Sequence, residues 1–328
     1  MMRASFESAG VQVDVDCQLP WVGGLISEGT AGELCPPAGG SASLRVQVES
    51  DHRPFTAHGW RYMSRGVWQR RDGVVVEDVC TTGFDLYARV LGDGATFTYR
   101  WRPRPRSRTA AVALRSRFHL LARAALLQYP ALWWAGAHGR APLHASAVAG
   151  PHATPLVCAA SGVGRSTLLV AEVERGHRTT SDNLGVSDGE SVWGLLEPAR
   201  VVGGAGRRMP HGRREIRISG RAAALTPSCV VTLERGDGER PVLLPCAPET
   251  AARALVTSTY MAGELRRYWV FAAVLAAATG RGPAHPAVAD TASRLTTRLP
   301  CWTVALGREP GARLDDLLSR AEVETWVS

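Results

Sequence analysis

The residues with the clearest chemical potential form a short glycine-containing segment, Ser161-Gly162-Val163-Gly164-Arg165-Ser166-Thr167. An apolar run over 155–159, typical of a buried strand, leads into it, and a helical pattern over 164–175 follows and ends at Gly176. In such a strand–turn–helix, backbone N–H groups and the helix N-terminus converge on phosphate oxygens. We therefore expect this loop to bind the phosphates of ATP or another nucleotide, with Ser166 as a ligand of Mg²⁺.

The loop departs twice from G-x-x-x-x-G-K-[ST], the usual pattern of phosphate-binding loops. Ala159 replaces the first glycine, and Arg165 replaces the lysine in a chain that contains no lysine at all. A planar, forked guanidinium does not superimpose on a compact ammonium group. Phosphate binding can therefore survive while phosphoryl transfer slows. The alternative for this segment is an ordinary tight turn before a helix.

Two flanking segments extend the pattern. His144-Ala145-Ser146-Ala147-Val148 precedes the loop, and Glu174 to Asn183, which includes Arg175-Gly176-His177 and Asp182-Asn183, follows it. In order and spacing these segments resemble the HPr kinase/phosphorylase family, in which a histidine opens the strand before the loop and R-G-H-x-x-x-x-D-D follows the helix. The resemblance covers about residues 110–235 and is specific over 143–183. It is closest to the HPr-kinase-like proteins of bacterial peptide natural-product clusters, including those of lasso peptides.

The resemblance implies ATP-dependent phosphorylation of a Ser or Thr hydroxyl on a peptide or protein. By this resemblance Asp182 would help to hold Mg²⁺, and His144 would orient the second acidic residue, which is the general base in the family. That second position is here Asn183, the only asparagine of the chain, and an amide cannot accept a proton at neutral pH. Asp182 could serve as the base instead. The alternative for His144 is a packed strand histidine.

Two functions therefore stay open. The first is an active kinase in which Arg165, Ser166 and Thr167 hold the phosphates and Mg²⁺. The second is a degenerate, pseudokinase-like protein that binds nucleotide, or nothing, and assists another biosynthetic enzyme; Ala159, Arg165 and Asn183 motivate it. Phosphoryl transfer depends mainly on positioning and charge stabilisation, so the missing carboxylate alone does not decide between them.

Composition excludes several other classes. The seven cysteines are scattered singly and the nine histidines show no ligand spacing, so neither a disulfide framework nor a zinc site is indicated. The net charge of +8 comes entirely from arginines that lie near no nucleic-acid motif, which favours an anionic ligand or acidic peptide over nucleic acid. No apolar run has the length of a membrane span and the N-terminus lacks a signal-peptide core, so we expect a cytoplasmic protein without membrane association.

The pattern of the whole chain predicts an α/β (α+β) fold. Residues 1–105 read as a β-rich region whose position suggests substrate or partner recognition, 106–245 as the HPr-kinase-like phosphate-loop core, and 246–328 as a mainly helical part that packs on the core. Within the core we expect strands, not βα repeats, after Arg175. The individual expectations are a stiff proline linker at 102–106, helices at 109–128, 248–260, 262–278, 286–299 and 313–320, and strands at 143–148, 155–159, 185–187, 192–195, 214–218, 229–233 and 301–306. For the basic run 207–214, a phosphate clamp and a solvated loop both remain possible.

Overall fold

The structure is a computed structural model that describes residues 1–37, 42–203, 205–209, 212–309, 311 and 313–325. The chain divides into two compact units. Unit 1 comprises Met1–Gly139 and Arg267–His285, and unit 2 comprises Arg140–Arg266 and Pro286–Ser328. Both units combine helices with sheets, so the protein is of mixed α/β class, as the sequence predicts.

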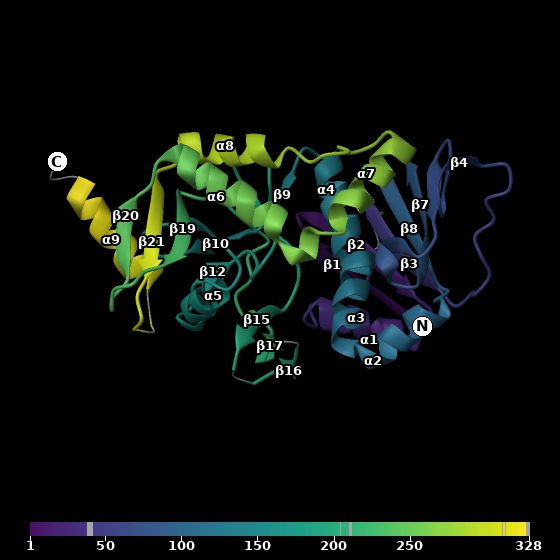
Figure 1. The fold of residues 1–328 in the computed structure, drawn as a ribbon, viewed down its shortest axis with the longest axis horizontal. Helices are drawn as coiled ribbons and strands as arrows, with labels where there is room; N and C mark the ends of the chain where they lie inside the picture. Colours follow the sequence, from purple (N-terminus) through teal and green to yellow (C-terminus); the bar gives the residue numbers. More distant parts are fainter. Residues whose placement is uncertain (38–41, 204, 210–211, 310, 312, 326–328) are drawn as a thin grey trace. The chain divides into compact units, whose positions relative to one another are not determined.

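Unit 1 is built on one eight-stranded sheet (Figure 1). Its strands alternate between buried apolar and more exposed polar residues, as in Leu44–Glu49, because only one face of the sheet is covered. In their order across the sheet the strands are β1 (Met2–Ser8), β2 (Val11–Cys17), β3 (Leu44–Glu49), β8 (Gly94–Trp101), β7 (Phe84–Leu91), β6 (Gly73–Val76), β5 (Val67–Arg70) and β4 (Arg61–Ser64).

Helices pack on the apolar face of this sheet. α4 (Tyr129–Ala137) contacts β2 and β3, and α7 (Tyr268–Thr279), from the later part of the chain, contacts β5, β6 and β7. Phe97 on β8 meets both helices through Trp133 and Phe271, with ring centroids 5.8 and 6.2 Å away. The remaining helical segments of unit 1 are α1 (Pro20–Gly29), η1 (Val79–Thr81), α2 (Pro105–Ala113), α3 (Arg115–Arg123) and the π-helical η2 (Ala124–Gln128).

Unit 2 is centred on a six-stranded sheet whose middle strands are parallel (Figure 1). α5 (Arg165–Glu174) and α9 (Leu314–Thr325) bury leucines against one face, and α6 (Pro248–Met261) packs on β11, β19 and β21 and is joined by α8 (Val288–Arg298). In their order across the sheet the strands are β12 (Arg178–Thr179), β10 (Ala145–Ala149), β11 (Pro155–Ala159), β19 (Cys229–Arg235), β21 (Cys301–Leu306) and β20 (Val242–Pro245).

Two small sheets complete unit 2. One has the order β18 (Ala224–Leu225), β14 (Val192–Gly194), β13 (Gly185–Ser187) and β9 (Ala141–Leu143), and the other the order β15 (Ala199–Val202), β17 (Arg213–Ile216) and β16 (Arg207–Arg208). A short 3₁₀ turn, η4 (Gly263–Leu265), follows α6. Between 176 and 247 the described residues form strands and contain no α-helix, which agrees with the expectation of strands after the loop helix.

Several element boundaries differ from the sequence expectations. The proline linker at 102–106 is interrupted because Pro105 begins α2, a position where proline costs no helix hydrogen bond. The single helix expected at 109–128 is divided among α2, α3 and η2, and the strand at 143–148 is broken at His144. The long helix at 262–278 begins only at Tyr268. The basic run 207–214 contains β16 and the start of β17, and its residues 210 and 211 lie outside the described part of the chain.

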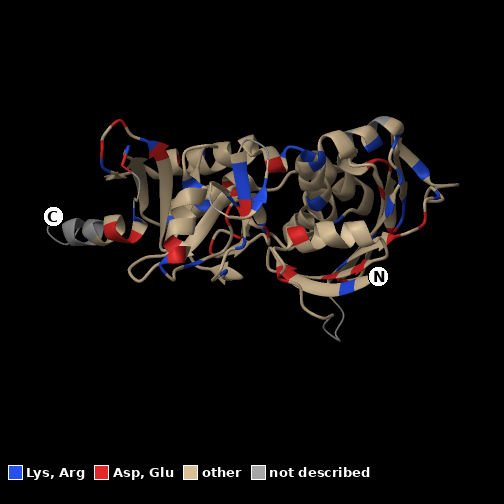
Figure 2. Ribbon diagram, turned by 90° about the horizontal axis from the view of Figure 1, so that it is seen from below, with Lys and Arg blue, Asp and Glu red and all other residues tan. Residues whose placement is uncertain are grey.

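The division into units also differs from the expected boundaries at 105 and 245. The helices of 105–137 belong to unit 1, because α4 packs on β2 and β3, α3 contacts α1 and α2 contacts α3, and α7 returns from the C-terminal part to pack on the same sheet. Arginines are dispersed over the ribbons of both units (Figure 2). Among the described residues no helix combines the length and apolarity needed to cross a membrane.

Candidate functional site

The loop Ser161–Thr167 joins the central strand β11 to the N-terminus of α5. Gly162 and Gly164 adopt positive φ values of 84° and 126°, which residues with a Cβ rarely tolerate, and Gly164 is the N-cap of α5. Glycine has no side chain that could cap the helix, and the first N–H bonded within it is that of Leu168, to the Gly164 carbonyl at 3.1 Å. The N–H groups of the first turn thus remain available to an anion.

The side chain of Arg165 turns into the protein interior and is only 6% exposed. Its Nη1 donates to the carbonyl of His144 at 2.6 Å, and its Nη2 donates to the carbonyl and the Oδ1 of Asn183 at 3.1 and 2.9 Å. Nη2 also lies 2.9 Å from Nε2 of His144. The guanidinium therefore joins the phosphate loop to the two other segments that the sequence singled out.

His144 and Asn183 meet because of where their strands end. His144 lies between β9 and β10, at the point where the chain passes from the four-stranded sheet to the six-stranded one. β13 starts just after Asn183 and pairs antiparallel with β9, with Gly185 opposite Leu143. This register brings Asn183 Oδ1 to 2.8 Å from His144 Nε2, and the histidine donates to it when Nε2 carries the proton.

Asp182 is held by its backbone and by one carboxylate oxygen. The hydroxyl of Ser146 on β10 donates to the Asp182 carbonyl at 2.9 Å, and the backbone N–H of Arg200 donates to Asp182 Oδ2 at the same distance. The preceding segment lies so close to β14 that a Cβ at Gly194 would come within 1.7 Å of the Thr180 carbonyl oxygen. Glycine at 194 is thus required for the path of the chain into Asp182.

Beyond this centre lies a cluster of buried charges that the sequence reasoning missed. Arg200 is the shared cation: its Nη1 donates to Glu264 at 2.6 Å, its Nη2 to Glu197 at 3.3 Å, and its Nε lies 3.9 Å from Glu215. Glu197 in turn accepts from the N–H of Leu184, next to Asn183, at 3.1 Å. No sequence motif marks these residues, because their spacing follows from strand pairing and not from a local repeat.

A second arginine lies at the opposite side of the loop. Arg235, the last residue of β19, donates from Nη2 to the carbonyl of Gly162 at 2.8 Å and is exposed to solvent. It is a cation beside the loop that is not sequestered as Arg165 is. Sequence reasoning missed it as well, although its position at the carboxyl end of a strand parallel to β11 is a recognisable signal.

Several buried polar atoms of the centre have no hydrogen-bond partner in the described structure: Asp182 Oδ1, His144 Nδ1, Asn183 Nδ2, Ser181 Oγ and Arg165 Nε. A buried polar atom left unpaired costs roughly 1–3 kcal/mol. Asp182 also lines a cavity of about 120 Å³ together with Leu169 and Ile216. Such a concentration of unpaired buried polar groups is typical of a ligand-binding or ion-binding site.

The electrostatics of the centre follow from this burial. Burial, with Arg165 adding to it, lowers the pKa of His144 to about 4, so the imidazole is neutral at pH 7. Burial raises the pKa of Glu197 to about 7, with Asp182 and Glu264 adding to the rise and Arg200 opposing it. Burial also lowers the pKa of Arg165, although the guanidinium stays charged.

The structure therefore brings His144, Arg165 and Asn183 into direct contact, with Asp182 adjacent in the chain. Ser166 and Thr167 lie on the first turn of α5, where Ser166 is half-buried and Thr167 is exposed. The turn before the helix contains Ser161, Gly162 and Val163. Within the described part of the chain, no hydrogen bond joins Ser166 to Asp182. The described residues also contain no group of three or more His, Cys, Asp or Glu side chains that could hold a metal ion alone.

Comparisons with known proteins found a likeness in structure but none in sequence. No family model matches the sequence, and no curated protein matches it. Among solved structures, the chain is similar to the Hpr(Ser) kinase/phosphatase from Coxiella burnetii, with 9% sequence identity and a TM-score of 0.30 over 57% of this chain and 93% of that one. At this TM-score the likeness carries no argument about function, which rests instead on the residues of the site.

Proposed function

We propose that unit 2 binds a nucleoside triphosphate at Ser161–Thr167 and acts as a kinase on a Ser or Thr hydroxyl of a peptide or protein. The observation that carries the proposal is that Arg165, inside the loop, hydrogen-bonds to His144 and Asn183. Three sequence segments that resemble parts of one kinase family thus converge on one buried centre.

The loop supplies the phosphate-binding element. The N–H groups of the first turn of α5 carry the positive end of the helix dipole, and the turn before them exposes Ser161 and Gly162. Arg235 adds a solvent-exposed cation next to Gly162, which compensates in part for the withdrawal of Arg165. Phosphate oxygens would therefore be bound mainly by backbone and by Arg235.

The residues fit a Mg²⁺ ion bound together with the phosphates. Mg²⁺ needs only one or two protein ligands when phosphates and water supply the rest. Asp182 Oδ1 is a carboxylate oxygen without a partner among the described residues, and Ser166 occupies the first turn of α5. When bound, the ion would neutralise charge on the transferring phosphoryl group.

The protein's own residues would handle the acceptor hydroxyl. Asn183 cannot take its proton, which leaves Asp182 as the carboxylate beside the centre. His144 is neutral at pH 7, and its Nδ1 is an acceptor or donor without a partner in the described structure. It is therefore a positioning group that orients Asn183 through Nε2.

The class of acceptor comes from the resemblance given above and from the charge of the chain. We propose a peptide or protein acceptor, in the maturation of a peptide natural product. A net charge of +8 favours an acidic acceptor.

A second function is favoured by one specific observation. The four contacts of the Arg165 guanidinium among the described residues are to His144 and Asn183, so it is not directed toward the phosphates, where a loop lysine would act. A chain built in this way could bind nucleotide, transfer no phosphoryl group, and serve as an accessory subunit of another biosynthetic enzyme.

Calorimetry with Mg-ATP and a phosphotransfer assay test the proposal in turn. We expect Mg-ATP to bind, and we expect Gly164→Val to weaken the binding because φ 126° is strained for valine. Gly176→Val is the matched control, since Gly176 also has positive φ, of 92°, but lies at the other end of α5. Equal binding by both variants would rule out the loop as the site.

The transfer assay separates the two functions. The cognate acceptor, or a pool of Ser/Thr peptides, is incubated with labelled ATP and the wild type or the double variant Arg165→Lys/Asn183→Asp. Activity of the wild type supports the kinase. Binding without transfer, together with transfer by the double variant, would identify a decayed kinase retained for another role.

A further inference from the structure

Unit 1 contains a large groove on the open face of its eight-stranded sheet. The groove has a volume of about 670 Å³, within the range of ordinary ligand pockets. Its floor consists of side chains that point away from the helices, contributed mainly by β3, β8 and β7, and its wall is the segment between β3 and β4. This site is distinct from the loop and the buried centre of unit 2.

Strand register arranges the floor in three rows across the sheet. The first row runs Arg45, Thr96, Arg89, and the second runs Gln47, Thr98, Tyr87. In the third row Glu49 and Arg100 line the groove, and Asp85 continues the row on β7 outside the lining. Directly opposed residues of neighbouring strands lie side by side, because the strands are about 4.8 Å apart. Each row therefore presents its own set of side chains.

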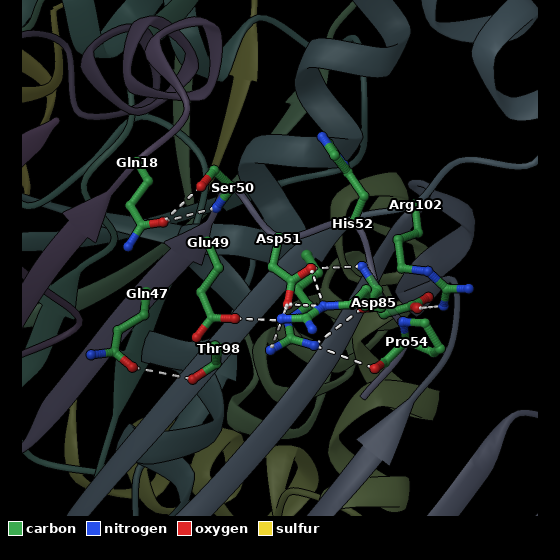
Figure 3. Close-up of polar contacts among 12 residues, drawn as sticks. Gln18, Gln47, Glu49, Ser50, Asp51, His52, Pro54, Asp85, Thr98 and Arg102 are labelled. Atoms are coloured by element: carbon green, nitrogen blue, oxygen red, sulfur yellow. Dashed lines mark hydrogen bonds and ion pairs between the residues drawn. The ribbon is translucent and has the colours of Figure 1, made fainter. Parts of the chain in front are cut away.

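The third row is already neutralised. Arg100 donates to Glu49 at 2.7 Å, lies 3.5 Å from Asp51, and donates to the carbonyls of Arg53 and Pro54 at 3.1 and 3.3 Å. Asp85 pairs with Arg102. Figure 3 shows Glu49, Asp51, Asp85 and Arg102 gathered around these contacts. Arg100 and Arg102 are therefore both already engaged by carboxylates of the protein.

The first row is the opposite case. Arg45 is exposed, and no hydrogen bond or ion pair of its side chain is found among the described residues. Arg89 has one partner, Asp72 at 3.1 Å, and both side chains of that pair are well exposed, so the pair is weak. The two arginines stand on either side of Thr96, about 10 Å apart by strand spacing, with a hydroxyl between them. This arrangement suits a carboxylate.

The middle of the groove is apolar and aromatic. Phe55 and Trp60 of the wall approach Tyr87 of the floor, with ring centroids 5.9 and 5.7 Å from it. Leu91, which lines the same groove next to the arginine row, is 54% exposed although it is apolar. The aromatic surface around Tyr87 suits one apolar side chain of a ligand, and the uncovered Leu91, beyond the arginine row, suits another.

We propose that this groove binds an extended acidic peptide segment, with its carboxylates at Arg45 and Arg89, one apolar side chain against Tyr87 and Trp60, and a second apolar side chain at Leu91 on the other side of the arginine row. The length supports a peptide: along β8 the lining runs from Gly94 to Arg100, roughly 20 Å at 3.3 Å per residue, which a single small anion would not fill. The charge pattern disfavours nucleic acid, because Arg100 at the other end is already paired with Glu49 and Asp51 and so does not extend the arginine row into a basic track for a phosphate backbone.

Fluorescence anisotropy on the full chain, without nucleotide, tests the proposal. The probes are a labelled acidic hexapeptide that contains leucine, two glutamates and phenylalanine in that order, the same peptide with lysines in place of the glutamates, and a labelled single-stranded hexanucleotide. We expect the acidic peptide to bind, with an affinity that falls as salt is raised, and the basic peptide not to bind. Stronger binding of the hexanucleotide than of the acidic peptide would overturn the proposal.

Variants place the binding in the groove. Arg45→Glu/Arg89→Glu should weaken the acidic peptide by about tenfold or more, and Leu91→Asn should weaken it less. Arg70→Glu is the matched control, because Arg70 is an exposed arginine of the same sheet outside the groove. Retained affinity in the double variant, or an equal loss in the control, would show that the groove is not the site. Circular dichroism confirms that each variant is folded.

The outcome does not depend on nucleotide binding in unit 2. A failure of the loop to bind Mg-ATP would leave the anisotropy result unchanged. A failure of peptide binding would leave the kinase proposal to be decided by its own assays.

Discussion

The buried centre of unit 2 and the groove of unit 1 differ in how much their charged groups lower the stability of the fold. In unit 2, Arg165, His144 and Asp182 are nearly excluded from solvent, and each has a polar atom without a partner in the described structure. In unit 1, the arginines of the groove are exposed or paired, and water can solvate what the protein does not. Burial of unpaired polar groups is unfavourable, whereas exposed charges are nearly neutral for stability.

This difference tells us where each region is sensitive. A substitution in the buried centre changes pKa values, stability and the proposed chemistry together, because all three depend on the same few contacts. A substitution in the groove should change ligand binding with little effect on the fold. The predictions below test this contrast from the largest effect to the smallest.

The largest effect is expected at Asp182. Asp182→Asn keeps an oxygen that can accept from the Arg200 N–H but removes the carboxylate, so phosphoryl transfer should fall by roughly 10²–10⁴-fold. Nucleotide binding measured without Mg²⁺ should be unchanged. Asp237→Asn, at an exposed carboxylate, serves as the control in the same phosphotransfer assay. Equal rates for wild type and Asp182→Asn would exclude Asp182 from the reaction.

The second prediction concerns stability against pH. The pKa of His144 is about 4 in the folded protein against an ordinary 6.5, so the unfolded chain takes the proton first and stability is lost as the pH falls from 6.5 toward 4. The pKa of Glu197 is about 7 against an ordinary 4.5, so its contribution is lost as the pH rises from 4.5 toward 7. In the wild type these two dependences oppose each other.

Glu197→Gln should expose the histidine alone. Urea unfolding of this variant at several pH values between 7 and 4 should show a free energy of unfolding that falls on acidification, by an amount on the order of 3 kcal/mol. Adding His144→Gln should flatten the curve. A curve that is equally steep with and without the histidine would mean that other groups govern the acid dependence.

The third prediction concerns Asn183→Asp. A carboxylate at this position would lie against His144 Nε2 and Arg165 Nη2, so it should raise the pKa of His144 by roughly 1–3 units above its present value of about 4. Asn183→Ala, which removes the acceptor without adding charge, should not raise it. An NMR titration of the labelled histidines measures both. Part of any gain in transfer rate would be offset because Arg165 neutralises the new carboxylate.

The sequence was most informative where one local segment determines the structure. The strand over 155–159 and the helix start near Gly164 were predicted correctly, because an apolar run, a glycine turn and a helical period occur together there. The stop at Gly280 also agrees with a left-handed cap, with φ 66°. The sequence did not reveal the break at His144, where the chain passes from one sheet to the other. The alternation of apolar and polar residues continues through the break, so 143–148 read as one strand.

The parts of the site that depend on strand pairing could not be predicted. Arg200, Glu197 and Glu264 come together only through sheet geometry and the turn after α6, and the groove of unit 1 exists only because three strands align in one register. The inward orientation of the Arg165 side chain could not be predicted from the sequence either. The motif placed this residue in the loop, but the acceptors that turn it inward are distant in sequence.

The smallest effect is expected in the groove, and it completes the contrast. Arg45→Gln removes an exposed charge that has no partner among the described residues, so the free energy of unfolding should change by less than about 0.5 kcal/mol. Arg100→Gln is the matched comparison in the same groove, because its guanidinium serves Glu49, Asp51 and two backbone carbonyls and packs 4.2 Å from the Phe55 ring centroid. It should cost about 1–2 kcal/mol. Urea unfolding at pH 7 measures both variants. If Arg45→Gln destabilised as much as Arg100→Gln, the first row would be structural, and its arginines would not be held ready for a ligand.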